Sequence, residues 1–146
     1  MTVLDIGCGP GFFSVEMALM AGSGGKVIAA DLQEEMLQKI SDKIKSTELE
    51  ERIILHKCEA DKIGVAENVD FVLLFYVVHE IPNKEQLFNE IVTLLKPGGQ
   101  VLIVEPPFHV SKTAFDETLR LAVKAGFKIV KGPRMLFQKT AVLKTE

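Results

Sequence analysis

Short apolar runs alternate with stretches of helical periodicity along the chain, and this alternation constrains the fold more than any other feature. Residues 34–45, for example, place their apolar side chains on one face of a helix. Residues 71–78 form the longest apolar run and are typical of a central strand buried on both faces. The predicted strands are residues 3–6, 27–30, 53–56, 71–78, 100–104, 127–130 and 134–143, and the predicted helices are residues 11–21, 34–45, 84–95 and 113–125.

Strands that alternate with helices indicate a parallel sheet with helices on both faces. Only Lys131, Gly132 and Pro133 join the last two predicted strands, which is too short for a crossover helix, so these strands should be antiparallel neighbours. The predicted fold is an α/β, Rossmann-like three-layer sandwich whose seven-stranded sheet is mostly parallel, with the last strand antiparallel. No repeat or linker interrupts the pattern, so residues 1–146 are predicted to form a single domain.

Three glycines follow the first predicted strand, in the sequence VLDIGCGPGFF at residues 3–13. In such sheets ligands bind outside the carboxyl ends of the strands, and the first strand–helix turn is the usual floor of the site. Gly7, Gly9 and Gly11 lack side chains, so a ligand can lie on the backbone, and the next helix points free N–H groups at the same place. The alternative is a purely structural turn, because many strand–helix turns contain glycine.

Two acidic residues near this turn favour a binding site over a purely structural turn. Asp5 lies at the mouth of the first strand, where a carboxylate can brace the N–H groups of the turn or meet a cationic group of a ligand. Asp31 ends the second strand, where an acid is placed to accept both hydroxyls of a ribose.

The stretch VLDIGCGPGFFS resembles the first motif of the class I S-adenosylmethionine-dependent methyltransferases, D-x-G-x-G-x-G. Its glycines fall at every second position and residue 12 is Phe, whereas a dinucleotide-binding fingerprint would have small residues near position 12. Four further stretches resemble motifs of the same family, in the same order along nearly the whole chain. They are VIAADL, KCEADKI, VDFVLLFYVVHEIPN and LLKPGGQVLIVEP.

The resemblance implies S-adenosylmethionine as methyl donor and S-adenosylhomocysteine as product. The methionine end of the donor would lie over residues 5–9, Asp31 would hold the ribose, and Glu59 and the Ala60 N–H would meet the adenine. The predicted donor-binding residues are Asp5, Ile6, Gly7, Cys8, Gly9, Gly11, Asp31, Leu32, Glu59, Ala60 and Phe75.

Methyl transfer from a sulfonium mainly requires a positioned acceptor, and it requires a base only where the acceptor carries a proton. We predict His79 as that base and Tyr76 as a second catalytic side chain, because both follow the fourth strand. The alternatives are a capping or packing role for His79 and core packing for Phe75. Glu80, Glu105 and His109 are further candidates near the ends of the fourth and fifth strands. The spacing of His79, Glu105 and His109 matches no standard metal site, so no metal is predicted.

Charge, hydropathy and cysteine content limit the kinds of partner and the cellular location expected for this protein. The formal net charge of −3 offers no basic excess, so nucleic acid is not expected. No apolar run approaches the ~20 residues that cross a bilayer, so no membrane partner is predicted. Cys8 and Cys58 form no metal or redox pair, and an intervening strand should keep them apart, so reduced thiols and a cytoplasmic location are predicted. The aromatic residues near the fourth strand fit a small-molecule acceptor, and equally a small thiol or a metalloid.

Only two residues precede Val3, whereas the family resemblance leads us to expect helices before the first motif that cover the donor. We therefore predict a methyltransferase (EC 2.1.1.-) whose cover comes from a second copy, as a homodimer, or from a partner chain. Two alternatives stay open. One is a donor-binding accessory or regulatory module with little activity of its own, and the other is a dinucleotide-binding α/β protein.

Overall fold

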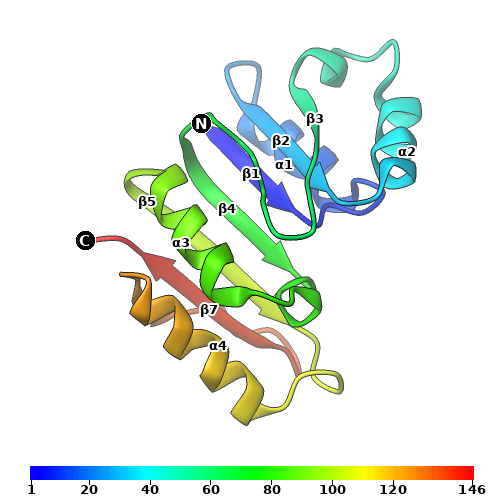
Figure 1. Cartoon of the computed structure of the whole chain (residues 1–146). Helices are drawn as coiled ribbons and strands as arrows, with labels where there is room; N and C mark the ends of the chain where they lie inside the picture. The colour runs from blue at the N-terminus through cyan, green and yellow to red at the C-terminus, as the bar shows by residue number, and fades with distance from the viewer.

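The computed structural model describes residues 1–146 and contains one seven-stranded sheet in the order β3-β2-β1-β4-β5-β7-β6 (Figure 1). The strands are β1 (Thr2–Ile6), β2 (Lys26–Asp31), β3 (Ile53–Lys57), β4 (Val69–Phe75), β5 (Leu95–Glu105), β6 (Lys128–Lys131) and β7 (Lys139–Lys144). The helices are α1 (Phe12–Ala21), α2 (Glu34–Ile44), α3 (Lys84–Leu94) and α4 (Lys112–Lys124), with short 3-10 turns η1 (Glu48–Glu51) and η2 (Val78–Glu80).

The strand pairing confirms the predicted architecture. Strands β1 to β5 pair in parallel, and β7 pairs antiparallel with both β5 and β6. The chain order reverses between β1 and β4, because β2 and β3 extend the sheet on one side of β1 and β4 begins the other side. A crevice at such a reversal, outside the carboxyl ends of the strands, is where ligands bind in this class of sheet.

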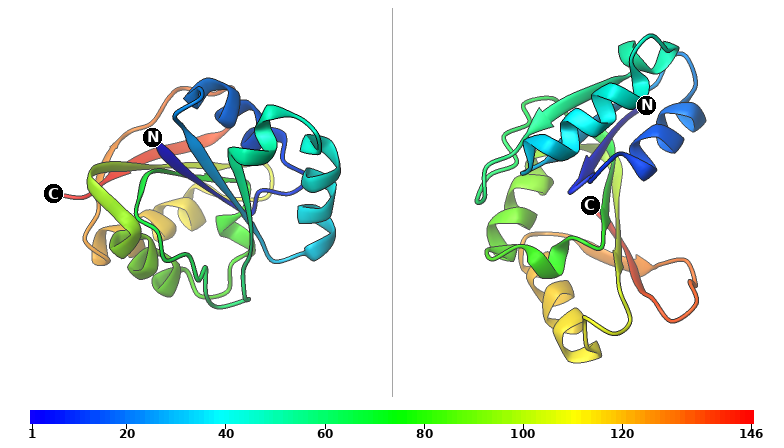
Figure 2. Two further views of the ribbon diagram at one scale, coloured as in Figure 1. Left: turned by 90° about the horizontal axis from the view of Figure 1, so that it is seen from above. Right: turned by 90° about the vertical axis from the view of Figure 1, so that its right-hand side faces the viewer.

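Helices cover both faces of the sheet, as the alternating pattern predicts (Figures 1 and 2). The larger core cluster joins α3 and α4 to the sheet through residues such as Phe88, Ile91 and Phe115. The smaller cluster joins α1 and α2 to the other face through Ala18 and Ile40. Ser111 begins α4 with a side-chain cap, since its Oγ accepts a hydrogen bond from the Ala114 N–H at 3.0 Å.

The predicted strand at 71–78 is wrong at its end, because β4 stops at Phe75. Tyr76 adopts a left-handed backbone with φ of 56°, which breaks the ladder and turns the chain into η2. The apolar run continues past the strand because Val78 is fully buried in the core of the next turn. Burial, and not strand pairing, therefore accounts for the last apolar residues of this run.

Two strands begin several residues away from their predicted starts. Strand β5 begins at Leu95, since the KPGG segment after α3 pairs with β4 through an irregular register. Strand β7 begins only at Lys139, because the preceding residues form a turn in which Phe137 has φ of 61°. None of the helices combines the length and apolar character that crossing a membrane requires.

Candidate functional site

The glycine turn after β1 is fastened to the end of β2. The N–H groups of Gly7 and Cys8 both donate to the Ala30 carbonyl, at 2.8 and 3.1 Å. The Gly9 N–H donates to Asp31 Oδ2 at 2.9 Å. Gly7, Gly9 and Gly11 have φ values of 71°, 54° and 90°, a backbone region that disfavours side chains.

The three glycines have different surroundings. A Cβ on Gly7 would collide with Val77, and a Cβ on Gly11 would lie 2.7 Å from Ile40 Cγ1. A Cβ on Gly9 would meet nothing within 4 Å, yet Gly9 lines a cavity beside the turn. Gly7 and Gly11 are therefore needed for packing, whereas Gly9 leaves backbone open to a ligand.

Asp31 has two partners in the protein. Its Oδ2 accepts from Gly9, and its Oδ1 accepts from the Gln33 N–H at 2.9 Å. An ionised carboxylate has about four acceptor positions, so two hydrogen bonds leave capacity for ribose hydroxyls. The residue is 9% exposed and lines the cavity, so that this capacity faces the open space.

Asp5 lies below the turn and outside the cavity lining. Its Oδ2 accepts a 2.6 Å hydrogen bond from Ser14 Oγ on α1, and none of the N–H groups of the turn bonds to it. The bracing role predicted for Asp5 thus falls to Asp31 and the Ala30 carbonyl. Burial raises the pKa of Asp5 to about 6, against a lowering by the Ser14 hydrogen bond and with a small further rise from Asp31.

The loop after β3 forms the opposite wall of the cavity. Its start is held by a 2.9 Å hydrogen bond from the Cys58 N–H to the Asp31 carbonyl. Glu59 and Lys62 pair across a tight turn that contains Ala60. Glu90 on α3 then fixes the end of the loop, accepting from the Ile63 and Gly64 N–H groups at 3.0 and 2.8 Å.

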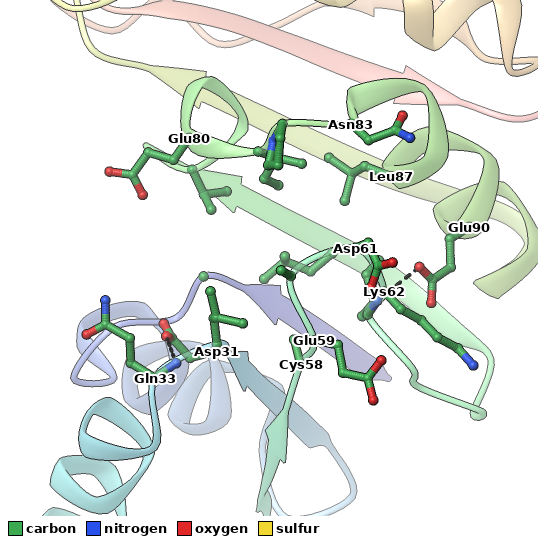
Figure 3. Close-up of a pocket in the computed structure, with 18 of the residues that line it drawn as sticks. Asp31, Gln33, Cys58, Glu59, Asp61, Lys62, Glu80, Asn83, Leu87 and Glu90 are labelled. Atoms are coloured by element: carbon green, nitrogen blue, oxygen red, sulfur yellow. Dashed lines mark hydrogen bonds between the residues drawn. The ribbon is translucent and has the colours of Figure 1, made fainter.

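The cavity between these elements has a volume of about 580 Å³, within the usual range of small-molecule sites (Figure 3). It runs from the glycine turn, past the end of β2, to the loop after β3 and the residues that precede α3. Its lining comprises Ile6, Gly7, Gly9, Asp31, Leu32, Gln33, Met36, Cys58, Glu59, Ala60, Asp61, Lys62, Ile63, Tyr76, Val77, Glu80, Ile81, Pro82, Asn83, Leu87 and Glu90.

The structure thus brings many of the predicted site residues together and leaves others outside the lining. Those on the lining are Ile6, Gly7, Gly9, Asp31, Leu32, Glu59, Ala60 and Tyr76. Those outside it are Asp5, Cys8, Gly11, Phe75 and His79.

Sequence reasoning missed Gln33, Met36, Leu87 and Glu90 on this lining. Helical periodicity assigns Met36 and Leu87 to packing faces, and nothing in the sequence indicates that these faces end at a cavity. The sequence pattern places Glu90 among the charged residues on the exposed side of its helix. Only the packing of α3 beside the loop after β3 identifies it as a loop anchor.

An aromatic row lies at the end of β4. The ring centroids of Phe13 and Phe75 are 4.3 Å apart, as are those of Phe75 and Tyr76. Phe13 and Tyr76 remain 37% and 36% exposed, so two rings of the row border open space. A cationic or flat apolar group can pack against such rings.

His79, on the turn that follows β4, meets Glu105 at the end of β5. His79 Nδ1 lies 3.2 Å from Glu105 Oε1, and the Glu105 side chain is buried at the end of β5. The structure contains no group of three or more His, Cys, Asp or Glu side chains arranged to hold a metal ion. His79, Glu105 and His109 therefore do not form a metal centre here.

Both cysteines are free thiols. Cys8 follows β1 and Cys58 follows β3, and β2 separates these strands, as predicted. Burial, with smaller contributions from Asp31 and Glu90, raises the pKa of the Cys58 thiol to about 11. Burial also raises the pKa of Cys8 far above its ordinary value, reinforced by Asp5 and Asp31.

Comparison with known proteins places this arrangement in a family. The family model described as "Methyltransferase domain" matches residues 1–136. The chain is 29% identical over 129 residues to the ubiquinone/menaquinone biosynthesis C-methyltransferase UbiE of Haemophilus ducreyi, covering 88% of this chain and 48% of the relative. The chain thus spans about half the length of the curated relatives it matches.

Solved structures show the same fold. A SAM-dependent methyltransferase from Aquifex aeolicus superposes with a TM-score of 0.83 at 27% identity, covering 98% of this chain and 80% of that one. The glycopeptide N-methyltransferase MtfA, complexed with S-adenosylmethionine, superposes with a TM-score of 0.85 at 13% identity, covering 99% and 81%. At that identity MtfA supports the fold alone.

Proposed function

Because the chain belongs to the class I S-adenosylmethionine-dependent methyltransferase-domain family, we propose that it transfers a methyl group from S-adenosylmethionine to a small-molecule acceptor. The donor carries its methyl group on a sulfonium and leaves as S-adenosylhomocysteine. The residues of this chain then have two tasks, to hold the donor and to place the acceptor atom in line with its methyl group.

The cavity fits the donor. Gly9 offers backbone that no side chain covers, and Asp31 keeps free acceptor positions for the ribose hydroxyls. The adenine would lie by the loop at 58–63, with Glu59 at its amino group and the Ala60 N–H at its ring. Met36, Ile63 and Leu87 supply apolar surface in the same part of the cavity.

One observation carries the proposal. Asp31 both fastens the glycine turn and opens into a cavity that continues to the adenine-side loop. A turn with a purely structural role would need neither the open backbone at Gly9 nor a cavity of about 580 Å³ beside it.

The acceptor would approach past the ends of β4 and β5, where Phe75 and Tyr76 would lie toward the methyl end of the donor. Curated relatives are named as ubiquinone/menaquinone or demethylmenaquinone methyltransferases, and these names support a small organic acceptor. The exposed rings of Phe13 and Tyr76 favour an acceptor with an apolar, flat portion. His79 is the proposed base.

The cover of this site is proposed to come from a second copy or a partner chain. Phe12 at the start of α1 is 76% exposed, and Phe108 after β5 is 92% exposed. Both side chains follow the carboxyl end of a strand, at the edge of the sheet where the site lies, and contiguous exposed apolar patches mark surfaces that another segment covers. Size-exclusion chromatography with light scattering, with and without S-adenosylhomocysteine, tests the homodimer directly.

The test of methyl transfer uses donor with an isotopically labelled methyl group and a panel of small phenols, thiols and amines. Release of S-adenosylhomocysteine with a labelled product identifies an enzyme. Replacing His79 with Ala should lower turnover by roughly 10²-fold and leave donor affinity within about 2-fold. Donor binding without transfer to any acceptor would instead favour the donor-binding accessory module.

A further inference from the structure

Glu105 is a buried carboxylate with a single side-chain partner. It ends β5, is 1% exposed, and its only side-chain hydrogen bond joins it to His79 Nδ1 at 3.2 Å. Burying a carboxylate is costly unless it is paired and hydrogen-bonded. Lys139 pairs with Glu105 across β5 and β7, but its Nζ contacts the Pro107 carbonyl instead.

The partner of this carboxylate is a partly exposed imidazole. The side chain of His79 is 26% exposed; its Nδ1 faces the buried Glu105 carboxylate, and its Nε2 faces the exposed side chain of Glu80. An ionised carboxylate can only accept a hydrogen bond, so the contact requires the proton on Nδ1. The neutral ring then carries its lone pair on Nε2.

We propose that Glu105 is a positioning residue that holds His79 in the Nδ1–H tautomer, so that Nε2 takes a proton from an acceptor hydroxyl. This inference rests on the proposed function. It assigns the acceptor to the class of compounds whose reacting atom carries a proton. The oxygen of the acceptor forms the new O–CH₃ bond, and the electron pair of the broken S–CH₃ bond stays on sulfur. The hydroxyl proton moves to Nε2 and then to solvent.

The surroundings of His79 favour this role. Two charged groups face the ring within 4 Å, Glu105 from β5 and Glu80 from its own turn, where Oε1 lies 3.9 Å from Nε2. The turn η2 that carries His79 begins at Val78, two residues after Tyr76. His79 therefore lies past the carboxyl end of β4, which is where the acceptor is proposed to approach.

Another histidine of the chain provides a contrast within the same molecule. His56 Nε2 lies 2.6 Å from the Ile63 carbonyl, which can only accept, so this ring is fixed with its proton on Nε2. Neutral His56 and His79 should therefore show opposite tautomers. The backbone carbonyl beside His56 orients a ring of the loop, whereas the carboxylate beside His79 also stabilises the imidazolium that forms when Nε2 takes a proton.

Long-range ¹H–¹⁵N NMR of the full chain tests the positioning claim without donor or acceptor. Spectra at alkaline pH, where the imidazoles are neutral, should show Nδ1–H for His79 and Nε2–H for His56. In Glu105→Leu, which offers no partner, His79 should lose this preference while His56 keeps its own. Nε2–H for His79 in the wild type, or an unchanged spectrum in Glu105→Leu, would overturn the proposal.

Kinetics test the consequence for turnover. Glu105→Gln keeps the size of the side chain, and it should lower kcat on a hydroxylated acceptor by roughly 10²-fold or more, with the KM for the donor within about 2-fold. The matched control is Glu85→Gln, which removes an exposed carboxylate paired with Lys124 and should leave kcat unchanged. An unaltered kcat in Glu105→Gln contradicts the positioning role. Failure of donor binding in the wild type would instead contradict the proposed function, and the tautomer result would stand apart from it.

Discussion

The Gly9 N–H donates a 2.9 Å hydrogen bond to Asp31 Oδ2, so the acid that ends β2 holds the turn that ends β1. Asp31 also accepts from the Gln33 N–H at the start of α2. One carboxylate therefore joins three segments around the cavity. Its remaining acceptor positions are those proposed for the ribose.

Replacing Asp31 with Ala should weaken S-adenosylhomocysteine binding by at least about 10-fold, because hydrogen bonds to a charged group each contribute about 1.5–3 kcal/mol. Titration calorimetry measures this change. The control is Asp42→Ala on α2, which removes an exposed carboxylate bonded only to Gln38 and should leave the affinity unchanged. Equal affinities for Asp31→Ala and wild type would remove the ribose assignment.

Gly11→Ala should mainly lower the stability of the protein, whereas Gly9→Ala should mainly weaken donor binding. Gly11→Ala places a Cβ 2.7 Å from Ile40 Cγ1 at a residue with positive φ. The free energy of unfolding should therefore fall by about 2 kcal/mol or more. Gly9→Ala meets no protein atom within 4 Å, so its cost should stay near the backbone strain of about 1–2 kcal/mol. Its methyl group would occupy the donor cavity and weaken donor binding at least about 10-fold. Urea unfolding and calorimetry separate the two, and unchanged donor affinity in Gly9→Ala would contradict the site.

Asp5→Asn should stabilise the protein at neutral and alkaline pH. Since the pKa of Asp5 is raised from 3.8 to about 6, ionisation of the carboxyl lowers stability as pH rises through this range. Above about pH 6 the ionised Asp5 lowers the free energy of unfolding by about 3 kcal/mol, and this loss disappears below about pH 3.8. Urea unfolding at about pH 8 and about pH 5 should therefore show a larger gain for Asp5→Asn at the higher pH. A gain that is the same at both pH values would show that Asp5 is not the titrating group.

Cys58 should react slowly with thiol reagents although it lines the cavity. Burial raises its pKa to about 11, so little thiolate is present at neutral pH. Native protein should show slow alkylation at Cys58, slower still with S-adenosylhomocysteine bound, and two free thiols after unfolding without reductant. Rapid alkylation that bound product does not slow would place Cys58 outside the donor site.

The fold follows from local patterns that sequence shows directly. Apolar runs of strand length alternate with helical periodicity, and the short KGP connection predicts the antiparallel pairing of β6 and β7. The end of β4 could not be predicted this way, because Val78 is apolar for burial in a turn and Tyr76 adopts a left-handed backbone. Composition alone does not distinguish a buried turn from a strand.

The parts of the site that lie within one segment of sequence were predictable, whereas contacts between segments far apart in the sequence were not. The glycine turn and Asp31 stand out in the sequence, and the structure places Gly7, Gly9 and Asp31 on one cavity. The hydrogen bond from Ser14 to Asp5 and the anchoring of the loop by Glu90 depend on tertiary packing. Likewise, the pairing of His79 with Glu105 follows from β4 and β5 lying side by side, which spacing alone does not reveal.

The central claim is that the cavity beside Gly9 and Asp31 binds the methyl donor, and titration calorimetry of the purified chain tests it most directly. S-adenosylmethionine and S-adenosylhomocysteine should bind with micromolar affinity and a stoichiometry of one per chain, while NAD should not bind. Binding of NAD, or equal and weak binding of all three compounds, would contradict the account.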